Sequence, residues 1–361
     1  PAEGKLLRAL TELEPGESWL VQPKQLDEDG RLWSPGIRDG VVPGSWFHQT
    51  EVFGPVLGLI AVKDLDEAIA VQNAVDYGLT AGIHALDPLE VARWVDRVEA
   101  GNLSVNRATT GAIVRRQPFG GWKRSAVGPS TKAGGPNTLV PLGTWEPVDR
   151  EPVPNILVEG IGRNAASVLK RAQVGLEFPE FDLVRRAAID DERWWTAEFG
   201  LARDRSELEA ERNVLRYRPV PVTIRLADGA PLRDLARLLC AAAVTRSPVT
   251  ISSSVPLPTP LTEVFGSPVP PIIVRGAVVE GDASFLQRLG TGRTPARLRL
   301  IGGDAAAIHE ALGGSIDTTI WSGPVTASGR IELLPFLREQ AVSVTAHRFG
   351  TPSPAMLRLP L

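Results

Sequence analysis

Strand-like and helical segments alternate along almost the whole chain, and this alternation constrains the fold more than any other feature. The clearest helix is predicted over 87–101, DPLEVARWVDRVEAG, where Asp87 can cap the first turn and Gly101 follows the last. The segment NLSVNR at 102–107 then has the composition of a strand. With a second helix predicted over 64–78, this order indicates an α/β fold for the first half.

The second half of the chain shows the same alternation. Strands are predicted at 220–226, 248–254, 270–276, 296–303 and 316–323, and helices at 231–244 and 304–314. Strands that alternate with helices are typical of a doubly wound domain with a parallel sheet.

The length of 361 residues exceeds what one hydrophobic core usually supports, so at least two domains are expected. The segment TWEPVDREPVPN at 144–155 is rich in proline, and after it Lys170 is the only lysine. This change in composition predicts a boundary near 145–155. The predicted division is a first domain at 1–147, a linker and helical segment at 148–215, an α/β domain at 216–330 and a C-terminal motif at 331–361.

The composition excludes several classes of protein. Apolar residues make up 43%, charged residues 22%, and no apolar run is long enough to span a membrane, so we expect a cytoplasmic protein. A net charge of −3 gives no electrostatic footprint for nucleic acid. One cysteine excludes a disulfide framework, and the four histidines are too scattered to predict a metal site.

Three stretches of the first 147 residues resemble the aldehyde dehydrogenase superfamily. They are TEVFGPVLGLIAVKDLDEAIAVQNAVDYGLTAGIHALD at 50–87, AGNLSVNR at 100–107 and QPFGGWKRSAVGPSTKAGGPNTL at 117–139. The forms TTGAIVRRQPFGG and KAGGPN are similar to one branch, the L-glutamate γ-semialdehyde (1-pyrroline-5-carboxylate) dehydrogenases. They most resemble the dehydrogenase half of the bifunctional proline dehydrogenase/glutamate-semialdehyde dehydrogenases. The resemblance implies that residues 1–147 are the C-terminal part of an aldehyde dehydrogenase catalytic domain.

In this family the glutamate of the motif E-x-F-G-P-V binds the hydroxyl groups of the NAD nicotinamide ribose. The resemblance therefore assigns cofactor binding to Glu51, and to Phe53 the place beside the nicotinamide. A carboxylate that accepts two hydroxyl donors is suited to hold a ribose. The alternative is a surface glutamate beside a core phenylalanine.

The loop before P-F-G-G holds the substrate α-carboxylate in this branch. The resemblance places that role on the backbone and hydroxyl of Thr110, Gly111 and Ala112, and it makes Phe119 an apolar wall. Glycine permits the close approach and turn that a backbone anion site requires. Asn106 is expected to shape the loop. Four basic residues could raise the local potential or form a solvated surface, namely Arg115, Arg116, Lys123 and Arg124.

The family oxidises aldehydes through a cysteine nucleophile that lies before E-x-F-G-P-V, and this chain has none there. The single Cys240 is expected to be a buried helix residue. The chain begins with proline and its only methionine is Met356, so we expect a piece of a longer polypeptide. We therefore expect no catalytic residue in this chain and no turnover by the chain alone.

The second half is similar to the additional domain of the long proline-utilisation enzymes, a degenerate Rossmann-like domain of the aldehyde dehydrogenase superfamily without activity. Residues 331–352 are similar to their C-terminal motif. The spacing Gly160-x-Gly162-x-x-Ala165 also matches a permissive dinucleotide fingerprint. A glycine-rich linker that opens a helix is the alternative interpretation of that spacing.

Three hypotheses follow for the function. The first is the C-terminal portion of a bifunctional enzyme with NAD in its dehydrogenase half, FAD in its proline-oxidising half, and peripheral membrane association of the parent. The second is a monofunctional dehydrogenase with an extra domain, and the third is a non-catalytic assembly module. The expected partners are L-glutamate γ-semialdehyde, the missing N-terminal part, and a second copy in a homo-oligomer.

Overall fold

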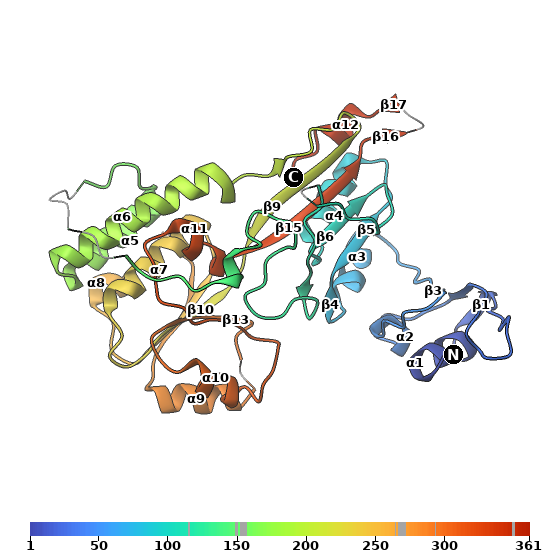
Figure 1. The fold of residues 1–361 in the computed structure, drawn as a ribbon, viewed down its shortest axis with the longest axis horizontal. Helices are drawn as coiled ribbons and strands as arrows, with labels where there is room; N and C mark the ends of the chain where they lie inside the picture. The colour runs from blue at the N-terminus through green and yellow to red at the C-terminus, as the bar shows by residue number, and fades with distance from the viewer. Residues whose placement is uncertain are drawn as a thin grey trace. The chain divides into compact units, whose positions relative to one another are not determined.

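The computed structural model describes residues 1–114, 116–148, 151, 157–263, 265, 272–292, 294–348 and 351–361. The chain divides into two compact units. The first comprises residues 1–78 and 85–99, and the second comprises residues 79–84 and 100–361 (Figure 1). Each unit is described by itself.

The first unit contains a three-stranded sheet and four helices. Strands β1 and β2 pair antiparallel, and β2 and β3 pair parallel. The elements of this unit are α1 (Gly4–Thr11), β1 (Ser18–Val21), β2 (Gly36–Asp39), α2 (Trp46–Gln49), β3 (Val56–Gly58), α3 (Leu65–Asn73), β4 (Tyr77–Gly78) and α4 (Pro88–Arg97).

Arg38 of β2 is the buried centre of this small sheet. Its guanidinium forms an ion pair with Glu17 at 2.8 Å and donates to the carbonyl oxygens of Ala9 and Glu12 at 2.6 and 2.7 Å. The ring of Phe47 lies 4.2 Å from the guanidinium carbon. A cation surrounded by acceptors and an aromatic face can be buried, so one charged residue joins strand, helix and loop.

Two predicted helices are confirmed, but both are shorter than expected. The carboxylates of Asp64 and Asp87 cap α3 and α4 by accepting backbone N–H groups. Helix α4 ends at Arg97, so Gly101 does not terminate it. A Cβ on Gly101 would lie 2.1 Å from the carbonyl oxygen of Gly120, so glycine is required there because two loops approach closely.

The second unit contains two five-stranded sheets and most of the helices. Its elements are β5 (Thr80–Ile83), β6 (Asn102–Val105), β7 (Trp122–Lys123), η1 (Val140–Leu142), α5 (Arg163–Ala172), η2 (Gln173–Gly175), α6 (Phe178–Trp194), η3 (Trp195–Phe199), β8 (Arg203–Asp204), β9 (Glu211–Pro219), β10 (Val222–Leu226), α7 (Leu232–Thr245), β11 (Val249–Ser253), α8 (Thr259–Thr262), β12 (Val274–Val279), α9 (Asp282–Gly290), β13 (Arg297–Ile301), α10 (Ala305–Ala311), β14 (Thr319–Trp321), α11 (Gly329–Glu332), η4 (Leu334–Phe336), β15 (Leu337–Thr345), β16 (His347–Arg348), β17 (Thr351–Pro352) and α12 (Pro354–Leu357).

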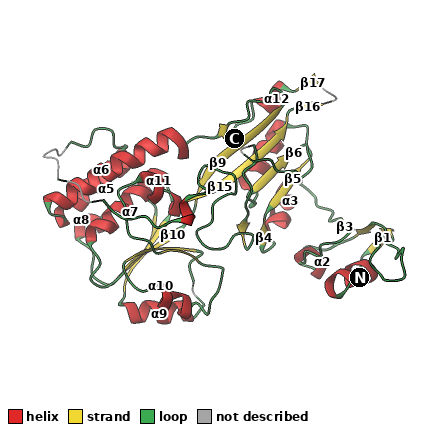
Figure 2. Cartoon of the chain, in the orientation of Figure 1, coloured by secondary structure: helices red, strands yellow, loops and turns green. Residues whose placement is uncertain are grey.

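One sheet is entirely parallel and confirms the predicted doubly wound domain. Its order is β12-β11-β10-β13-β14, so the chain starts in the centre and builds outward to both edges. Helices α9 and α10 cover one face, while α5, α6 and α7 lie on the other (Figure 2). Helix α7 carries an almost unbroken run of buried residues because it is covered on both sides.

The other sheet combines segments from both ends of this unit. Its order is β5-β6-β15-β9-β8, with β15 parallel to β6 and antiparallel to β9. The long strands β9 and β15 run side by side next to β5 and β6 (Figure 1). Strand β15, from the C-terminal part of the chain, therefore lies between β6 and β9 in the middle of this sheet.

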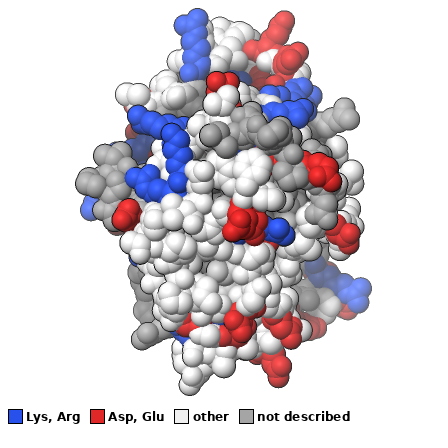
Figure 3. Space-filling view, turned by 90° about the vertical axis from the view of Figure 1, so that its left-hand side faces the viewer, with Lys and Arg blue, Asp and Glu red and all other residues white. Residues whose placement is uncertain are grey.

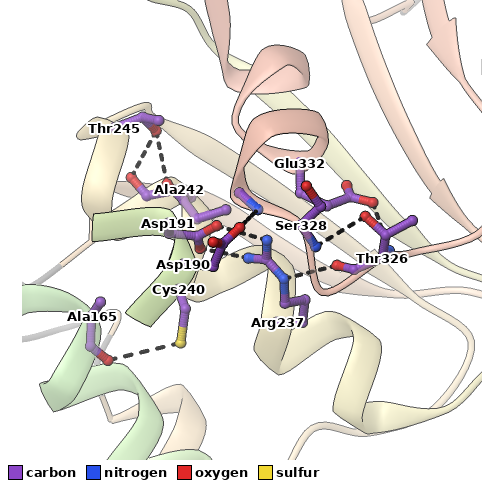
Figure 4. Close-up of polar contacts among 12 residues, drawn as sticks. Ala165, Asp190, Asp191, Arg237, Cys240, Ala242, Thr245, Thr326, Ser328 and Glu332 are labelled. Atoms are coloured by element: carbon purple, nitrogen blue, oxygen red, sulfur yellow. Dashed lines mark hydrogen bonds and ion pairs between the residues drawn. The ribbon is translucent and has the colours of Figure 1, made fainter. Parts of the chain in front are cut away.

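A buried ion pair fixes α7 against α6. Arg237 of α7 binds both carboxylate oxygens of Asp191 of α6 at 2.6 and 2.7 Å, and it donates to the carbonyl oxygen of Thr326 (Figure 4). Both side chains are fully buried. Burial raises the pKa of Asp191 to about 6, although Arg237 opposes this shift. Two-point binding compensates part of the desolvation cost.

Candidate functional site

A pocket in the second unit gathers the residues predicted to bind the substrate carboxylate. Its walls contain Thr110, Gly111, Ala112 and Phe119. The complete lining is Asn102, Leu103, Ser104, Arg107, Thr109, Thr110, Gly111, Ala112, Gln117, Phe119 and Ser343. The pocket therefore lies between the loop after β6 and the C-terminal strand β15, which supplies Ser343.

The predicted anion-binding loop has a backbone suited to that role. Gly111 has a φ of +82°, and nothing lies within 4 Å of a Cβ placed on it. None of the described residues accepts a hydrogen bond from the backbone N–H groups of Gly111 or Ala112. The left-handed turn makes glycine the residue that fits, and N–H groups without a partner among the described residues are of the kind that bind anions.

Asn106 lies where the loop leaves the sheet. Its φ is +56°, and its N–H donates to the carbonyl oxygen of Ile83 at 2.8 Å. Asparagine tolerates the left-handed region better than most residues. This geometry fits the shaping role expected for it.

Phe119 is held by backbone pairing with the KAGGPN segment. Its N–H donates to the carbonyl oxygen of Ala133 at 3.0 Å, and the N–H of Ala133 donates back at 2.8 Å. The ring is partly exposed at the pocket wall. This position fits the apolar wall that the resemblance assigned to Phe119.

Lys132 stabilises the turn around Phe119 from inside the protein. Its ammonium donates to Asn102 Oδ1 at 2.9 Å and to the carbonyl oxygen of Gly120. Asn102 in turn accepts the N–H of Gly120 and donates to the carbonyl oxygen of Pro118. Burial lowers the pKa of Lys132 to about 7, and the charge of Glu339 offsets part of that effect.

Glu339 of β15 connects the KAGGPN segment to the C-terminal strand. Its carboxylate accepts the N–H of Lys132 at 2.6 Å and Asn137 Nδ2 at 2.7 Å. Asn137 also donates to the hydroxyl of Tyr217 on β9. One buried carboxylate therefore fixes both ends of the segment that supports Phe119.

Glu51 and Phe53, the predicted cofactor residues, belong to the first unit. The carboxylate of Glu51 is exposed, and Lys5 Nζ donates to the Glu51 carbonyl oxygen at 2.6 Å. The Phe53 ring is 78% exposed and its φ is +52°, an unusual conformation for an aromatic residue. Phe53 is therefore not a core residue of this unit. The alternative of a surface glutamate beside a core phenylalanine does not hold for Phe53.

The four basic residues differ in their surroundings. Arg124 binds Asp317 at 2.8 and 2.9 Å on the protein surface, so its charge is partly neutralised. Lys123 is half-buried with a φ of +51°. Arg116 contributes to lowering the pKa of Glu211, while Arg115 lies outside the described residues.

Cys240 is buried in α7, as predicted. Its side chain is inaccessible, and Sγ lies 3.8 Å from the carbonyl oxygen of Ala165 (Figure 4). Burial raises the pKa of this thiol to about 12. A neutral, inaccessible thiol does not act as a nucleophile at neutral pH.

The segment Gly160-x-Gly162-x-x-Ala165 leads into helix α5, but the backbone N–H of Gly162 already has a partner inside the protein. The N–H of Gly162 donates to Glu192 Oε1 at 2.9 Å. A Cβ on Gly162 would lie 2.1 Å from that oxygen. This contact supports the interpretation of a structural glycine at a helix start.

The carboxyl edge of the parallel sheet is cross-linked by its own side chains. Buried Arg225 donates to Ser252 Oγ at 2.8 Å and pairs with Asp282 at 2.5 Å. Glu280 binds Arg288, and Asp304 caps α10. In doubly wound domains nucleotides bind at this edge, so carboxylates and internal pairs there disfavour a phosphate.

Charge on the visible face of Figure 3 is mixed, with both signs interspersed among uncharged residues.

Within the described ranges, no three His, Cys, Asp or Glu side chains form a group that could hold a metal. No described helix is both long enough and apolar enough to cross a membrane.

The sequence did not identify the residues that hold the pocket loop from behind. Gln117, Lys132 and Glu339 are buried polar side chains with several partners each. Two of them lie in quoted motifs, Gln117 in QPFGG and Lys132 in KAGGPN. Their partners are more than 90 residues away in most cases, so no local signal pointed to them.

Comparison with known proteins agrees with this geometry. Residues 11–140 match the model of the aldehyde dehydrogenase family. A 1-pyrroline-5-carboxylate dehydrogenase of Staphylococcus epidermidis is 41% identical over 114 residues, 32% of this chain and 22% of the relative. An alpha-ketoglutarate semialdehyde dehydrogenase of Haloferax volcanii is 48% identical over 99 residues, 27% of this chain and 20% of the relative.

A solved structure resembles nearly the whole chain. Proline utilization A from Corynebacterium freiburgense superimposes with a TM-score of 0.75 at 41% identity, covering 97% of this chain and 31% of that protein. The chain therefore spans about a fifth of the curated relatives and about a third of this larger enzyme. The predicted fold is confirmed, including the Rossmann-like second part. Over residues 11–140 this chain is similar to the aldehyde dehydrogenase family.

Proposed function

We propose that this chain supplies the substrate-carboxylate pocket and the nicotinamide-ribose contact of an NAD-dependent enzyme that oxidises L-glutamate γ-semialdehyde to L-glutamate in proline catabolism. The observation that carries the proposal is the pocket that brings Thr110, Gly111, Ala112 and Phe119 together. Its free backbone donors suit a carboxylate, and the neighbouring aromatic wall suits an aliphatic chain.

The exposed Glu51 carboxylate and the exposed Phe53 ring fit the ribose and nicotinamide ends of NAD. When bound, NAD accepts the hydride from the substrate. Glu51 would fix the ribose by accepting its hydroxyl protons, and Phe53 would limit the positions of the ring. The backbone of Gly111 and Ala112 would hold the substrate carboxylate.

The thiol that attacks the aldehyde must come from another polypeptide segment, because Cys240 is buried and protonated. We propose a bifunctional parent, since the similarity to proline utilization A extends over 97% of this chain. In that case FAD belongs to its proline-oxidising part. The second α/β domain has a structural role, and a monofunctional parent with an extra domain is the alternative.

The test joins this chain to the preceding two-thirds of the Corynebacterium freiburgense enzyme and measures NADH formation from the semialdehyde. We expect activity from the joined protein and none from the chain alone. Glu51→Ala should reduce kcat/KM for NAD by tenfold or more, and Gly111→Val should raise KM for the semialdehyde with less effect on NAD. Glu28→Ala, an exposed site, is the control. A joined, folded protein without NADH formation would reject the proposal.

A further inference from the structure

We propose that Glu211 and Asn213 of β9 are positioning residues for the pocket: they hold Gln117 and Arg107, which hold the ligand-binding loop. This inference rests on the proposed function and deepens it, because it names what controls the shape of the same pocket. Glu211 and Asn213 do not line the pocket, whereas Gln117 and Arg107 do.

Gln117 is the central contact between the loop and β9. Its Oε1 accepts the N–H of Ile113 at 2.8 Å, which fixes the loop two residues after Gly111. Its Nε2 donates to Asn213 Oδ1 at 2.6 Å and to Glu211 Oε1 at 3.2 Å. Since the side chain is only 7% exposed, these partners determine its orientation.

Arg107 connects the start of the same loop to the same carboxylate. Its Nη1 lies 2.8 Å from Glu211 Oε1, and Asn213 Nδ2 donates to this oxygen at 2.9 Å. Burial raises the pKa of Glu211, but hydrogen bonds from Asn213 and Arg107 and the charges of Arg107 and Arg116 outweigh it. The pKa is therefore lowered, and the carboxylate remains charged at neutral pH.

Asn213 is itself fixed by Asp204 of β8 and by Ser206 in the segment between β8 and β9. Its side chain is buried, its Nδ2 also donates to Ser206 Oγ, and its N–H donates to Asp204 Oδ2 at 2.9 Å. Strand β9 pairs with β15 along its whole length. The support for the loop is therefore part of a rigid sheet.

The loop between Arg107 and Gln117 is exposed from 108 to 114 and contains the backbone donors of the pocket. Without the contacts of Arg107 and Gln117 with β9, the loop would have to become ordered when a ligand binds. The loss of conformational entropy would weaken binding. Substitutions on β9 should therefore reduce affinity for a carboxylate ligand that these residues do not touch.

The experiment uses the full chain in three forms: Glu211→Ala, Asn213→Ala, and the matched control Glu209→Ala on an exposed site two residues away. Amide hydrogen exchange is compared over 107–119 and over α7, and L-glutamate binding is measured by calorimetry. We expect exchange over 107–119 to accelerate about fivefold or more in the two β9 variants, with α7 unchanged and with L-glutamate affinity lowered by a similar factor.

Unchanged exchange over 107–119 in the β9 variants would overturn the inference, and so would equal acceleration over α7. If Asn213→Ala fails to fold, the isosteric Glu211→Gln decides, with a smaller change in the same direction expected. Wild-type chain that does not bind L-glutamate would count against the proposed function, while the exchange result would still decide the positioning role.

Discussion

At the scale of single residues, buried polar side chains determine how the pocket is built. Lys132 and Asn137 are 3% and 0% exposed, and both contact Glu339, which is 8% exposed. Each has partners for most of its polar atoms, so burial is tolerated and the geometry is specific. The role of such residues cannot be predicted from the sequence, because it depends on partners that only the fold brings close.

Lys132 should make stability depend on pH. Its pKa is about 7 in the folded protein and 10.5 without burial, so the unfolded chain binds more protons between these values. The contribution of Lys132 to the free energy of unfolding should therefore rise with pH from about 7 to about 10 and level off below about 7, where both states are protonated. Urea unfolding at several pH values tests this.

The variant Lys132→Met removes the titrating group, and the exposed Lys170→Met is its control. The difference in unfolding free energy between wild type and Lys132→Met should change with pH by up to a few kcal/mol, since one pKa unit corresponds to about 1.4 kcal/mol. A constant difference over the window would contradict the assigned pKa.

At the scale of elements, helix starts were predicted better than helix ends. Asp64 and Asp87 cap their helices as their sequence positions indicated, because capping is a local interaction. Gly78 and Gly101 follow helices that end several residues earlier. Gly101 serves a contact with Gly120 instead, and a contact between distant loops leaves no local pattern.

Gly329 of α11 is a second glycine required by close packing. A Cβ there would lie 2.7 Å from the carbonyl oxygen of Asp190 and 2.7 Å from Asp191 Cα, both on α6. Gly329→Ala should destabilise the second unit by about 1–3 kcal/mol, as overpacking does. Gly281→Ala at the start of α9, with nothing within 4 Å, should change stability by much less. Equal losses in urea unfolding would refute the packing explanation.

At the scale of the whole molecule, the C-terminal strand joins the two halves of the chain. Strand β15 separates β6 from β9, and its residues Glu339 and Ser343 reach the Lys132 segment and the pocket. The division at 1–147, 148–215, 216–330 and 331–361 stays a prediction. The sheet nevertheless contains segments from the first, second, third and fourth of these ranges. A homo-oligomer also stays a prediction.

A chain that ends after Glu332 should lose the order of the pocket, because β6 and β9 each lose a neighbouring strand and Lys132 loses Glu339. Amide exchange over β6 and 117–137 should become at least tenfold faster. The control ends after Ala346, which keeps β15 and removes the last 15 residues. Protection over β6 equal to wild type in the shorter chain would show that β15 is dispensable.

The sequence by itself predicted the alternation of strands and helices and the parallel character of the sheet of β10 to β14. Through its resemblance to a family it also indicated the aldehyde dehydrogenase segment and a role for the loop around Gly111. Periodicity, caps and short motifs depend on neighbouring residues, so they can be recognised in the sequence alone. Only the tertiary structure decided that β15 lies between β6 and β9, and that Glu211 and Asn213 support Gln117. The physical reason is that strand periodicity indicates a buried face but names no partner across 90 or more residues.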